Sequence, residues 1–348
     1  GINVTPATAI DLYARAGSPA TAGNATVTME SIQAYDNGAG IAAHAEAFYG
    51  DAHIQMTEVE TYNNWYTDGV NAYARADGGD ATITASHVWS HGSALRGVYA
   101  VAVIGGAGPG GDASVNLSDV IADDAAAGAA MDLYAYTPTG NATVRMTAVD
   151  YYRNLALDGY AGGVVAQAVS GDGNALVYLQ DLSATGNGHL QAGAPPTVVG
   201  SGVYAHAATQ NGEARIALAR VTGSYNDLNG ITAVAQSAVS GDAVITATDI
   251  YAAENGVYFY YLGSNYVGEG MDLRADANAG NAHVDLSYAD AVNNTVEGIY
   301  AKATVQTAGN ASTTIHDDVN ASNNGNIGVE TWVSTPGAGN ASVSISDV

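Results

Sequence analysis

One motif recurs eleven times along the 348 residues and constrains the fold more than any other feature. It consists of a glycine, then Asn, Asp or Glu, then an alanine. Apolar residues follow, mostly at every second position, as in Gly111–Val120. The glycines lie 27 to 39 residues apart: Gly23, Gly50, Gly79, Gly111, Gly140, Gly173, Gly212, Gly241, Gly280, Gly309 and Gly339. A repeat of this length indicates a solenoid, in which each unit buries its apolar face only against its neighbours.

The spacing inside each repeat is typical of strands. After the glycine, apolar residues alternate with polar ones, which is the period of a strand with one buried face. A second alternating segment precedes each glycine, and Val70, Ala72 and Ala74 would share its inner face. A third, weaker element is expected where Asp119-Val120 and Asp181-Leu182 follow the first strand. No segment shows a sustained helical stripe.

These observations predict an all-β fold, a right-handed parallel β-helix (β-solenoid) of about eleven coils of roughly 30 residues. Residues 1–348 would form a single elongated domain, with enlarged loops at 182–202 and 251–270. If each strand pairs with its equivalent one coil away, at roughly 4.8 Å, the rod is on the order of 50 Å long. Right-handedness follows from the general preference of crossovers between parallel strands.

The charge of the chain limits its partners. The formal net charge is −25, with one lysine and eight arginines, so nucleic acid and anionic membrane surfaces would be repelled. No apolar run is long enough to insert into a membrane as a helix. There are no cysteines, which excludes disulfides and thiolate zinc sites. Acidity with almost no lysine suits an extracellular or cell-surface location.

The polar residue after each glycine is expected to stack from coil to coil. Stacked amides and carboxylates would bond to the turn backbone and to one another. This structural ladder would contain Asn24, Asp51, Asp80, Asp112, Asn141, Asn174, Asp242, Asn281, Asn310 and Asn340, with Glu213 in the same slot.

Calcium is the one cofactor that the sequence leaves open. Stacked carboxylates repel one another, and Ca²⁺ would relieve that repulsion. A second acidic column supplies the candidate ligands, namely Asp119, Asp181, Asp249, Asp317 and Asp347. The glycine-rich stretch 105–110 matches the start of a calcium-binding repeat, but no aspartate follows Pro109 at the position that this repeat requires. Turn chemistry is therefore the favoured interpretation of these carboxylates.

Recognition, if any, is expected from loops and outward aromatic residues. Insertions in solenoids often form the binding face, and tyrosine tolerates both water and packing. The candidate recognition residues are Tyr251, Tyr258, Tyr260, Tyr261, Tyr266 and Trp65. The alternative is that these loops only cover a sheet.

No catalytic group is predicted. Glycoside hydrolysis needs two carboxylates flanking the bond. Asp123-Asp124 and Asp317-Asp318 are adjacent pairs, and neighbouring strand residues are expected to point to opposite faces. The eight histidines suggest neither a metal cluster nor a triad. We therefore expect a protein that is not an enzyme.

The alternation of Gly-Asn/Asp-Ala-x-Val-x-Met/Leu-x-Asp-Val with Gly-Val-x-Ala-x-Ala resembles the degenerate repeats of autotransporter passengers and filamentous-haemagglutinin-like adhesins. The resemblance covers nearly all the chain and lies in repeat style. It implies a right-handed β-helix, export, and adhesion or surface display. It carries over no functional residue.

Two functions follow as expectations. One is an adhesin-like surface module with a glycan or protein ligand. The other is a subunit of a self-assembling extracellular filament, since bare solenoid ends expose unpaired backbone groups. Unpaired backbone groups at the ends are also expected if the sequence is a segment of a longer protein. A polysaccharide-binding or polysaccharide-degrading β-helix protein is the alternative.

Overall fold

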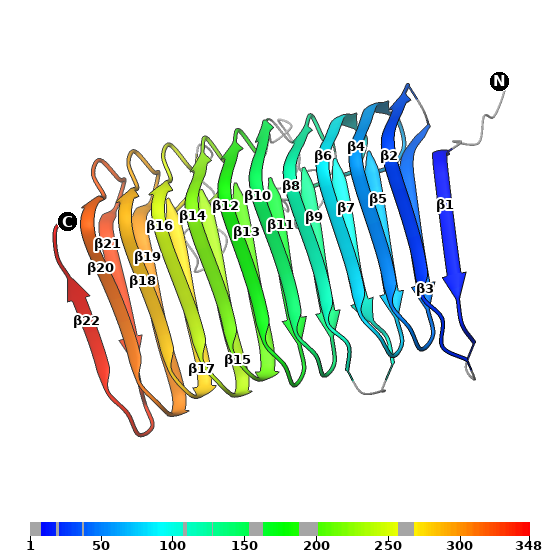
Figure 1. Ribbon diagram of the computed structural model, residues 1–348. Helices are drawn as coiled ribbons and strands as arrows, with labels where there is room; N and C mark the ends of the chain where they lie inside the picture. Colours follow the sequence, from blue (N-terminus) through cyan, green and yellow to red (C-terminus); the bar gives the residue numbers. More distant parts are fainter. Residues whose placement is uncertain are drawn as a thin grey trace.

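The computed structural model describes residues 8–18, 21–36, 38–106, 110–126, 128–152, 163–187, 201–256 and 268–348, where all regular secondary structure is β-strand (Figure 1). The odd-numbered strands are β1 (Thr8–Ala16), β3 (Ala39–Ala47), β5 (Val70–Ala76), β7 (Val98–Ile104), β9 (Met131–Thr137), β11 (Val164–Ser170), β13 (Val203–Asn211), β15 (Ile231–Ser240), β17 (Met271–Ala279), β19 (Glu297–Ala308) and β21 (Ile327–Ser334). The even-numbered strands are β2 (Ala25–Tyr35), β4 (Ala52–Asn64), β6 (Ala81–Ser93), β8 (Ala113–Asp123), β10 (Ala142–Tyr152), β12 (Ala175–Thr185), β14 (Ala214–Ser224), β16 (Ala243–Tyr251), β18 (Ala282–Asp290), β20 (Ala311–Asn320) and β22 (Ala341–Ile345). One coil is an odd strand and the even strand that follows it.

The strands form two parallel sheets of eleven strands each, the odd sheet and the even sheet, which lie one behind the other in Figure 1. Each strand pairs with its equivalent in the coils before and after. Val144, for example, lies beside Val115 and Val177. Equivalent side chains therefore stack into columns along the rod. The predicted parallel β-solenoid is confirmed, and its right-handed sense stays a prediction.

The core between the sheets is built from one inner face of mostly small side chains and one of larger side chains. The odd sheet contributes mostly alanines, such as Ala43 and Ala45, which are fully buried. The even sheet places larger side chains opposite them, such as Ile54 and Met56, at most 1% exposed. Small residues facing larger ones let the two sheets pack closely.

The predicted third element is not a separate strand. Every coil has a left-handed residue at an equivalent point of its even strand or just after it, for example Asp119 (φ 50°) and Asp181 (φ 52°). The strand continues past this bend: the pairing skips Asp119, and Val120 is again fully buried. A single left-handed residue turns the chain without ending the ladder. The prediction of a third strand was therefore wrong in its boundaries, because the period-two pattern resumes after the bend.

The two predicted loops at 182–202 and 251–270 lie largely outside the described residues. β12 ends at Thr185 and β13 begins at Val203, whereas β16 ends at Tyr251 and β17 begins at Met271. In the described part of the chain no helix is suited to crossing a bilayer.

Candidate functional site

The polar residues after the repeat glycines form one column, which we call the outer ladder. The main-chain N–H of Asp51 donates to Oδ1 of Asn24 over 2.9 Å, and the same contact joins each later member to the one before it as far as Glu213. No such bond joins Glu213 to Asp242 among the described residues, and the Glu213 carboxylate pairs with Arg215 over 3.3 Å. The ladder resumes at Asp242 and runs to Asn340.

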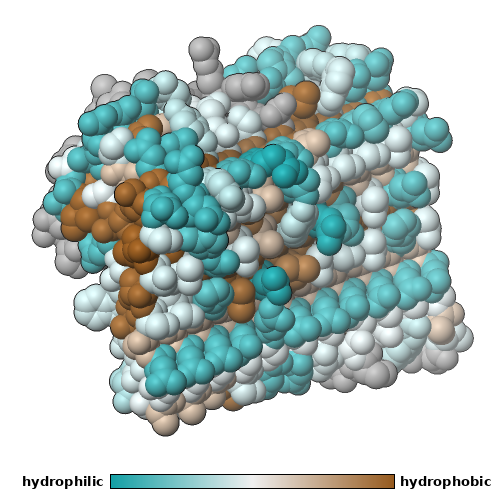
Figure 2. All heavy atoms as spheres, turned by 60° about the vertical axis from the view of Figure 1, so that its left-hand side comes forward, coloured by the Kyte–Doolittle hydropathy of each residue, from teal (hydrophilic) through white to brown (hydrophobic). Residues whose placement is uncertain are grey.

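From Gly50 onward, the glycine before each ladder residue is required by close packing of the turns. A Cβ on Gly111 would lie 1.9 Å from the carbonyl oxygen of Gly79, and one on Gly140 would lie 2.1 Å from that of Gly111. These contacts are with backbone and cannot be relieved by a side-chain rotation. The glycine therefore lets adjacent turns approach closely enough for the ladder bond. Figure 2 shows that hydrophilic residues run in a straight row along the molecule.

A second column of asparagines, the inner ladder, lies at the opposite turns and was not predicted. Its members are Asn187, Asn226, Asn255, Asn294 and Asn324. The N–H and the Nδ2 of Asn226 both donate to Oδ1 of Asn255, over 3.1 and 3.0 Å. Asn255 Nδ2 donates to the Gly223 carbonyl over 2.9 Å. The spacing of these asparagines, 29 to 39 residues, matches that of the repeat glycines and was the available signal.

The inner ladder is interrupted in the early coils. Asn64 pairs in register with Ser93, where a ladder would need a second asparagine. Asn64 is 1% exposed, and neither its Nδ2 nor its Oδ1 has a hydrogen-bond partner in the described structure. Nearby, the Arg96 guanidinium bridges Asp68 (2.9 Å) and Asp132 (3.0 Å) in place of the amide column.

The five candidate calcium ligands occupy the left-handed bend of their coils. The same bend holds Glu58, His87, Ala148, Arg220 and Tyr288 in other coils. Asp119 therefore lies 3.5 Å from His87, and Asp181 pairs with Arg220. This pair with Arg220 holds the pKa of the Asp181 carboxyl below its ordinary value.

The column of bends is thus mixed in charge, and only Asp317 and Asp347 are acidic in consecutive coils. In the part of the chain that the structure describes, no three His, Asp or Glu side chains converge on a metal position. Aspartate suits the bend because it tolerates a left-handed backbone. The structure therefore accounts for these aspartates by backbone geometry.

Two histidines each contact two carboxylates in this region. His91 Nδ1 lies 2.5 Å from Asp123, and its Nε2 lies 3.8 Å from Asp124. Asp124 has a left-handed backbone (φ 52°), so the expected opposite orientation of this adjacent pair is wrong. His316 lies 2.7 Å from Asp317 and 3.1 Å from Asp285, and the bond to Asp317 raises the pKa of His316. Both histidines join neighbouring coils.

The candidate recognition residues are not brought together. Trp65 is 68% exposed at the turn after β4, and Tyr251 is 44% exposed at the end of β16, six coils away. Tyr258, Tyr260, Tyr261 and Tyr266 lie outside the described residues.

An aromatic column that the sequence did not reveal lies on the early even strands. The rings of Tyr35 and Tyr62 stack with centroids 5.1 Å apart, and the His91 ring lies 5.8 Å from Tyr62. Trp89, 45% exposed, points outward two residues before His91. Glu60 accepts hydrogen bonds from Gln33 and Tyr35 beside these rings.

Three buried carboxyl groups gather near the start of β17 and β19. Glu269, Asp272 and Glu297 are 8%, 4% and 8% exposed. Burial, together with the charge of Asp272, raises the pKa of Glu269 to about 8. Burial also raises the pKa of Asp272, although Arg274 lies 2.6 Å from its carboxylate. Glu269 therefore holds a proton at neutral pH that the unfolded chain would release.

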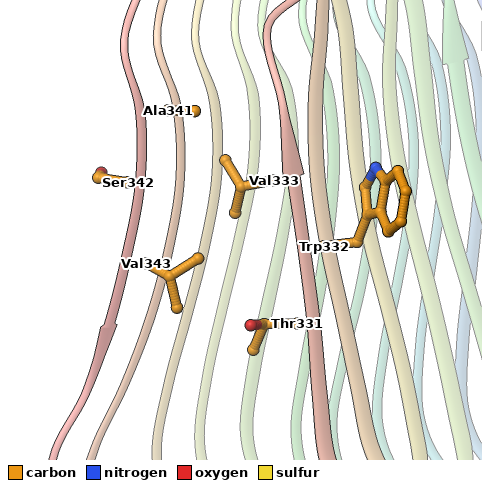
Figure 3. A pocket seen from close by; sticks show the side chains of 6 residues that line it. All are labelled: Thr331, Trp332, Val333, Ala341, Ser342 and Val343. Atoms are coloured by element: carbon orange, nitrogen blue, oxygen red, sulfur yellow. The ribbon is translucent and has the colours of Figure 1, made fainter.

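Both ends of the rod are open edges in the described structure. β1 and β2 pair only with β3 and β4, and β21 and β22 only with β19 and β20. At the C-terminal end, Val343 and Ile345 are 48% exposed, whereas the residues two coils earlier in their columns are fully buried. Figure 3 shows Val333 and Val343 pointing toward each other between the last two strands, and Trp332 pointing away. Hydrophobic residues gather at this end in Figure 2.

Comparison of the chain with protein-family models, with curated proteins and with solved structures found no match.

Proposed function

We propose that this chain is a non-catalytic structural module of an extracellular or cell-surface protein, and that its role is to form a stiff rod. The observation that supports this proposal is the continuity of both parallel sheets from the first coil to the last. Each coil is joined to the next by two strand pairings and, over most of the length, by a side-chain ladder at a turn. Such repeated bonds between neighbours resist bending and separation of coils.

The resemblance to autotransporter passengers and filamentous-haemagglutinin-like adhesins supports the location and a role in surface display. In that role the rod would present side chains at a distance from its attachment. Trp65 and Tyr66, 68% and 63% exposed, and the outward faces of both sheets are the surfaces available for a ligand.

Polysaccharide binding is the second candidate, and the aromatic column favours it. Tyr35, Tyr62 and Trp89 offer flat apolar rings beside the carboxylate of Glu60, which is suited to a partner with both apolar faces and hydroxyl groups. A ligand of this kind would lie along the rod, because the rings stack in the direction of the coils.

Small-angle scattering and negative-stain images of the purified chain, with and without a chelator, test the structural role. We expect rods on the order of 50 Å per subunit, because eleven coils stack at roughly 4.8 Å. Their dimensions should not depend on the chelator. A globular particle, or collapse after chelation, would contradict the proposal.

A panel of soluble polysaccharides separates the remaining functions. Retention of the chain on an immobilised polysaccharide, lost in Trp89→Ala and Tyr62→Ala, would establish the second candidate. Release of new reducing ends would show that the chain is an enzyme and overturn the non-catalytic assignment.

A further inference from the structure

We infer that copies of this chain join head to tail, with β21 and β22 of one copy pairing with β1 and β2 of the next. The inference rests on the proposed structural role. It specifies the partner, a second copy of the chain, and the register in which their strands pair. The two ends of the described rod offer complementary groups in hydrogen bonding, in apolar shape and in outward columns.

The hydrogen-bonding groups match at the two turns. Within the rod, Asp51 N–H donates to Asn24 Oδ1, and Ala25 N–H donates to the Asp51 carbonyl, both over 2.9 Å. The last coil repeats the first half of this pattern, with Asn340 Oδ1 and Ala341 N–H directed to the open side. The first coil repeats the other half, with the N–H and carbonyl of Asn24 directed outward. Joining the ends would therefore extend the outer ladder by one more step.

The apolar ends also match in size. In the extended register Val329, Thr331 and Val333 of β21 would face Ile10, Leu12 and Ala14 of the next copy. The smaller Thr331 meets the larger Leu12, and Val333 meets the smaller Ala14. In the even sheet, Val343 and Ile345, each 48% exposed, would stack on Val27 and Met29. Val27 and Met29 are already 5% and 2% exposed, so the apolar surface removed from water is mainly that of Val343 and Ile345, and its burial favours association.

The outward columns continue across the joint. Trp332 and Tyr13 are each 57% exposed and belong to the same column, so their rings would lie one strand apart. Ser342 would stand beside Thr26, continuing a column of mostly polar side chains. One pair opposes the joint, since Glu330 would lie beside Asp11.

The groups at the turns favour head-to-tail over head-to-head contact. Contact between two identical ends would place the Asn24 N–H groups of two copies against each other. A heterologous contact of two different ends does not close and produces a linear filament.

Cysteine pairs test the register, since the chain contains no native cysteine. The variants are Thr26→Cys with Ser342→Cys, and Thr28→Cys with Ser344→Cys, each pair outward and in register across the joint. The mismatched control is Thr26→Cys with Ser344→Cys, where the Cα atoms would be more than ~7 Å apart and could not be bridged without movement. The two cysteines of one chain are about 50 Å apart and cannot pair with each other.

We expect both in-register variants to form covalent multimers on non-reducing gels, at least about tenfold faster than the mismatched control, which cannot reach disulfide geometry. Each single-cysteine variant should form no ladder beyond a dimer. Equal rates for matched and mismatched pairs would overturn the joint. Filaments in images together with equal rates would leave the structural role standing and reject this register. A monomer at every concentration, without matched cross-links, would overturn the joint and leave a monomeric rod.

Discussion

The main-chain N–H of Asp51 donates to the side-chain Oδ1 of Asn24 over 2.9 Å, across 27 residues of sequence. It joins the same two turns as the backbone bond from the Ala25 N–H to the Asp51 carbonyl, also 2.9 Å long. At the other turn, the Asn226 N–H donates to Asn255 Oδ1 over 3.1 Å in the opposite sense along the rod. The two ladders therefore fix the turns of successive coils from both edges of the core, which explains why side-chain amides recur there.

Asn255→Ala should destabilise the rod far more than Asn64→Ala. Asn255 accepts two hydrogen bonds from Asn226 and donates to Gly223 and Asn294, so its loss leaves buried groups unsatisfied, at a cost of about 2–4 kcal/mol. Asn64 is equally buried but makes no side-chain bond in the described structure, so its truncation should cost less than about 1 kcal/mol. Urea and thermal unfolding followed by circular dichroism compare the two variants. Equal losses would show that the inner ladder contributes little.

Gly79→Ala should be severely destabilising, whereas the adjacent Gly78→Ala should be tolerated. A Cβ on Gly79 would lie 2.5 Å from the Gly50 carbonyl carbon and oxygen, which are fixed by the neighbouring turn. At Gly78 the nearest atom is Cδ1 of Tyr49, at 3.1 Å, and that ring can move. We expect a loss of roughly 3 kcal/mol or more for Gly79→Ala and within about 1 kcal/mol for Gly78→Ala. Thermal unfolding midpoints check the difference, and similar midpoints would mean that the turns separate easily.

The period-two pattern was enough to predict the strands and their stacking, because one-sided burial leaves a direct trace in sequence. It did not locate the bend. Asp119, Ala148 and Arg220 share a left-handed backbone but no side-chain chemistry, so an acidic column was inferred from the aspartates alone. The alternation resumes immediately after each bend, which made one bent strand look like two elements.

Other features escaped because they depend on neighbours one coil away. Asn226 and Asn255 lie in polar turn segments, and their burial follows only when the turns stack. The contact of Asp124 with His91 depends on a left-handed backbone that the sequence does not specify. The repeat spacing alone could have revealed the inner ladder.

Stability should fall as pH rises from about 4.5 to about 8, and Glu269→Gln should weaken this dependence. The folded pKa of Glu269 is raised to about 8, mainly by burial, so the native state retains a proton that the unfolded state releases above its ordinary value of 4.5. The unfolded state then binds fewer protons in this window, and each such group lowers stability by up to about 1.4 kcal/mol per pH unit. Unfolding midpoints at pH 5, 6, 7 and 8 measure the slope. An unchanged slope in Glu269→Gln would assign the dependence to other groups.

Glu330→Gln should strengthen association of the rods at pH 7. In the head-to-tail register Glu330 would lie one strand spacing, roughly 4.8 Å, from Asp11 of the next copy, and like charges at that distance repel. Glu330 already interacts with Glu297, whose pKa is raised by burial and by the Glu330 charge. The one cationic residue of β1 is Arg15, four residues from Asp11 along the strand. Replacing the Glu330 carboxylate with an amide removes the repulsion.

Light scattering across protein concentration, at pH 7 and constant ionic strength, measures this effect. The control is Asp172→Asn, which makes the same charge change on an exposed turn in the middle of the rod and leaves an amide oxygen to accept the bond from Asn211. If general repulsion between rods of net charge −25 were responsible, the two variants would associate equally. We expect Glu330→Gln to lower the concentration for assembly at pH 7 by about 3- to 30-fold, because relief of one close like-charge pair near a surface is worth roughly 1–2 kcal/mol. Asp172→Asn should change it by less than about twofold, since a single distant charge is largely screened. An equal response of both variants would remove the Glu330–Asp11 contact from the joint.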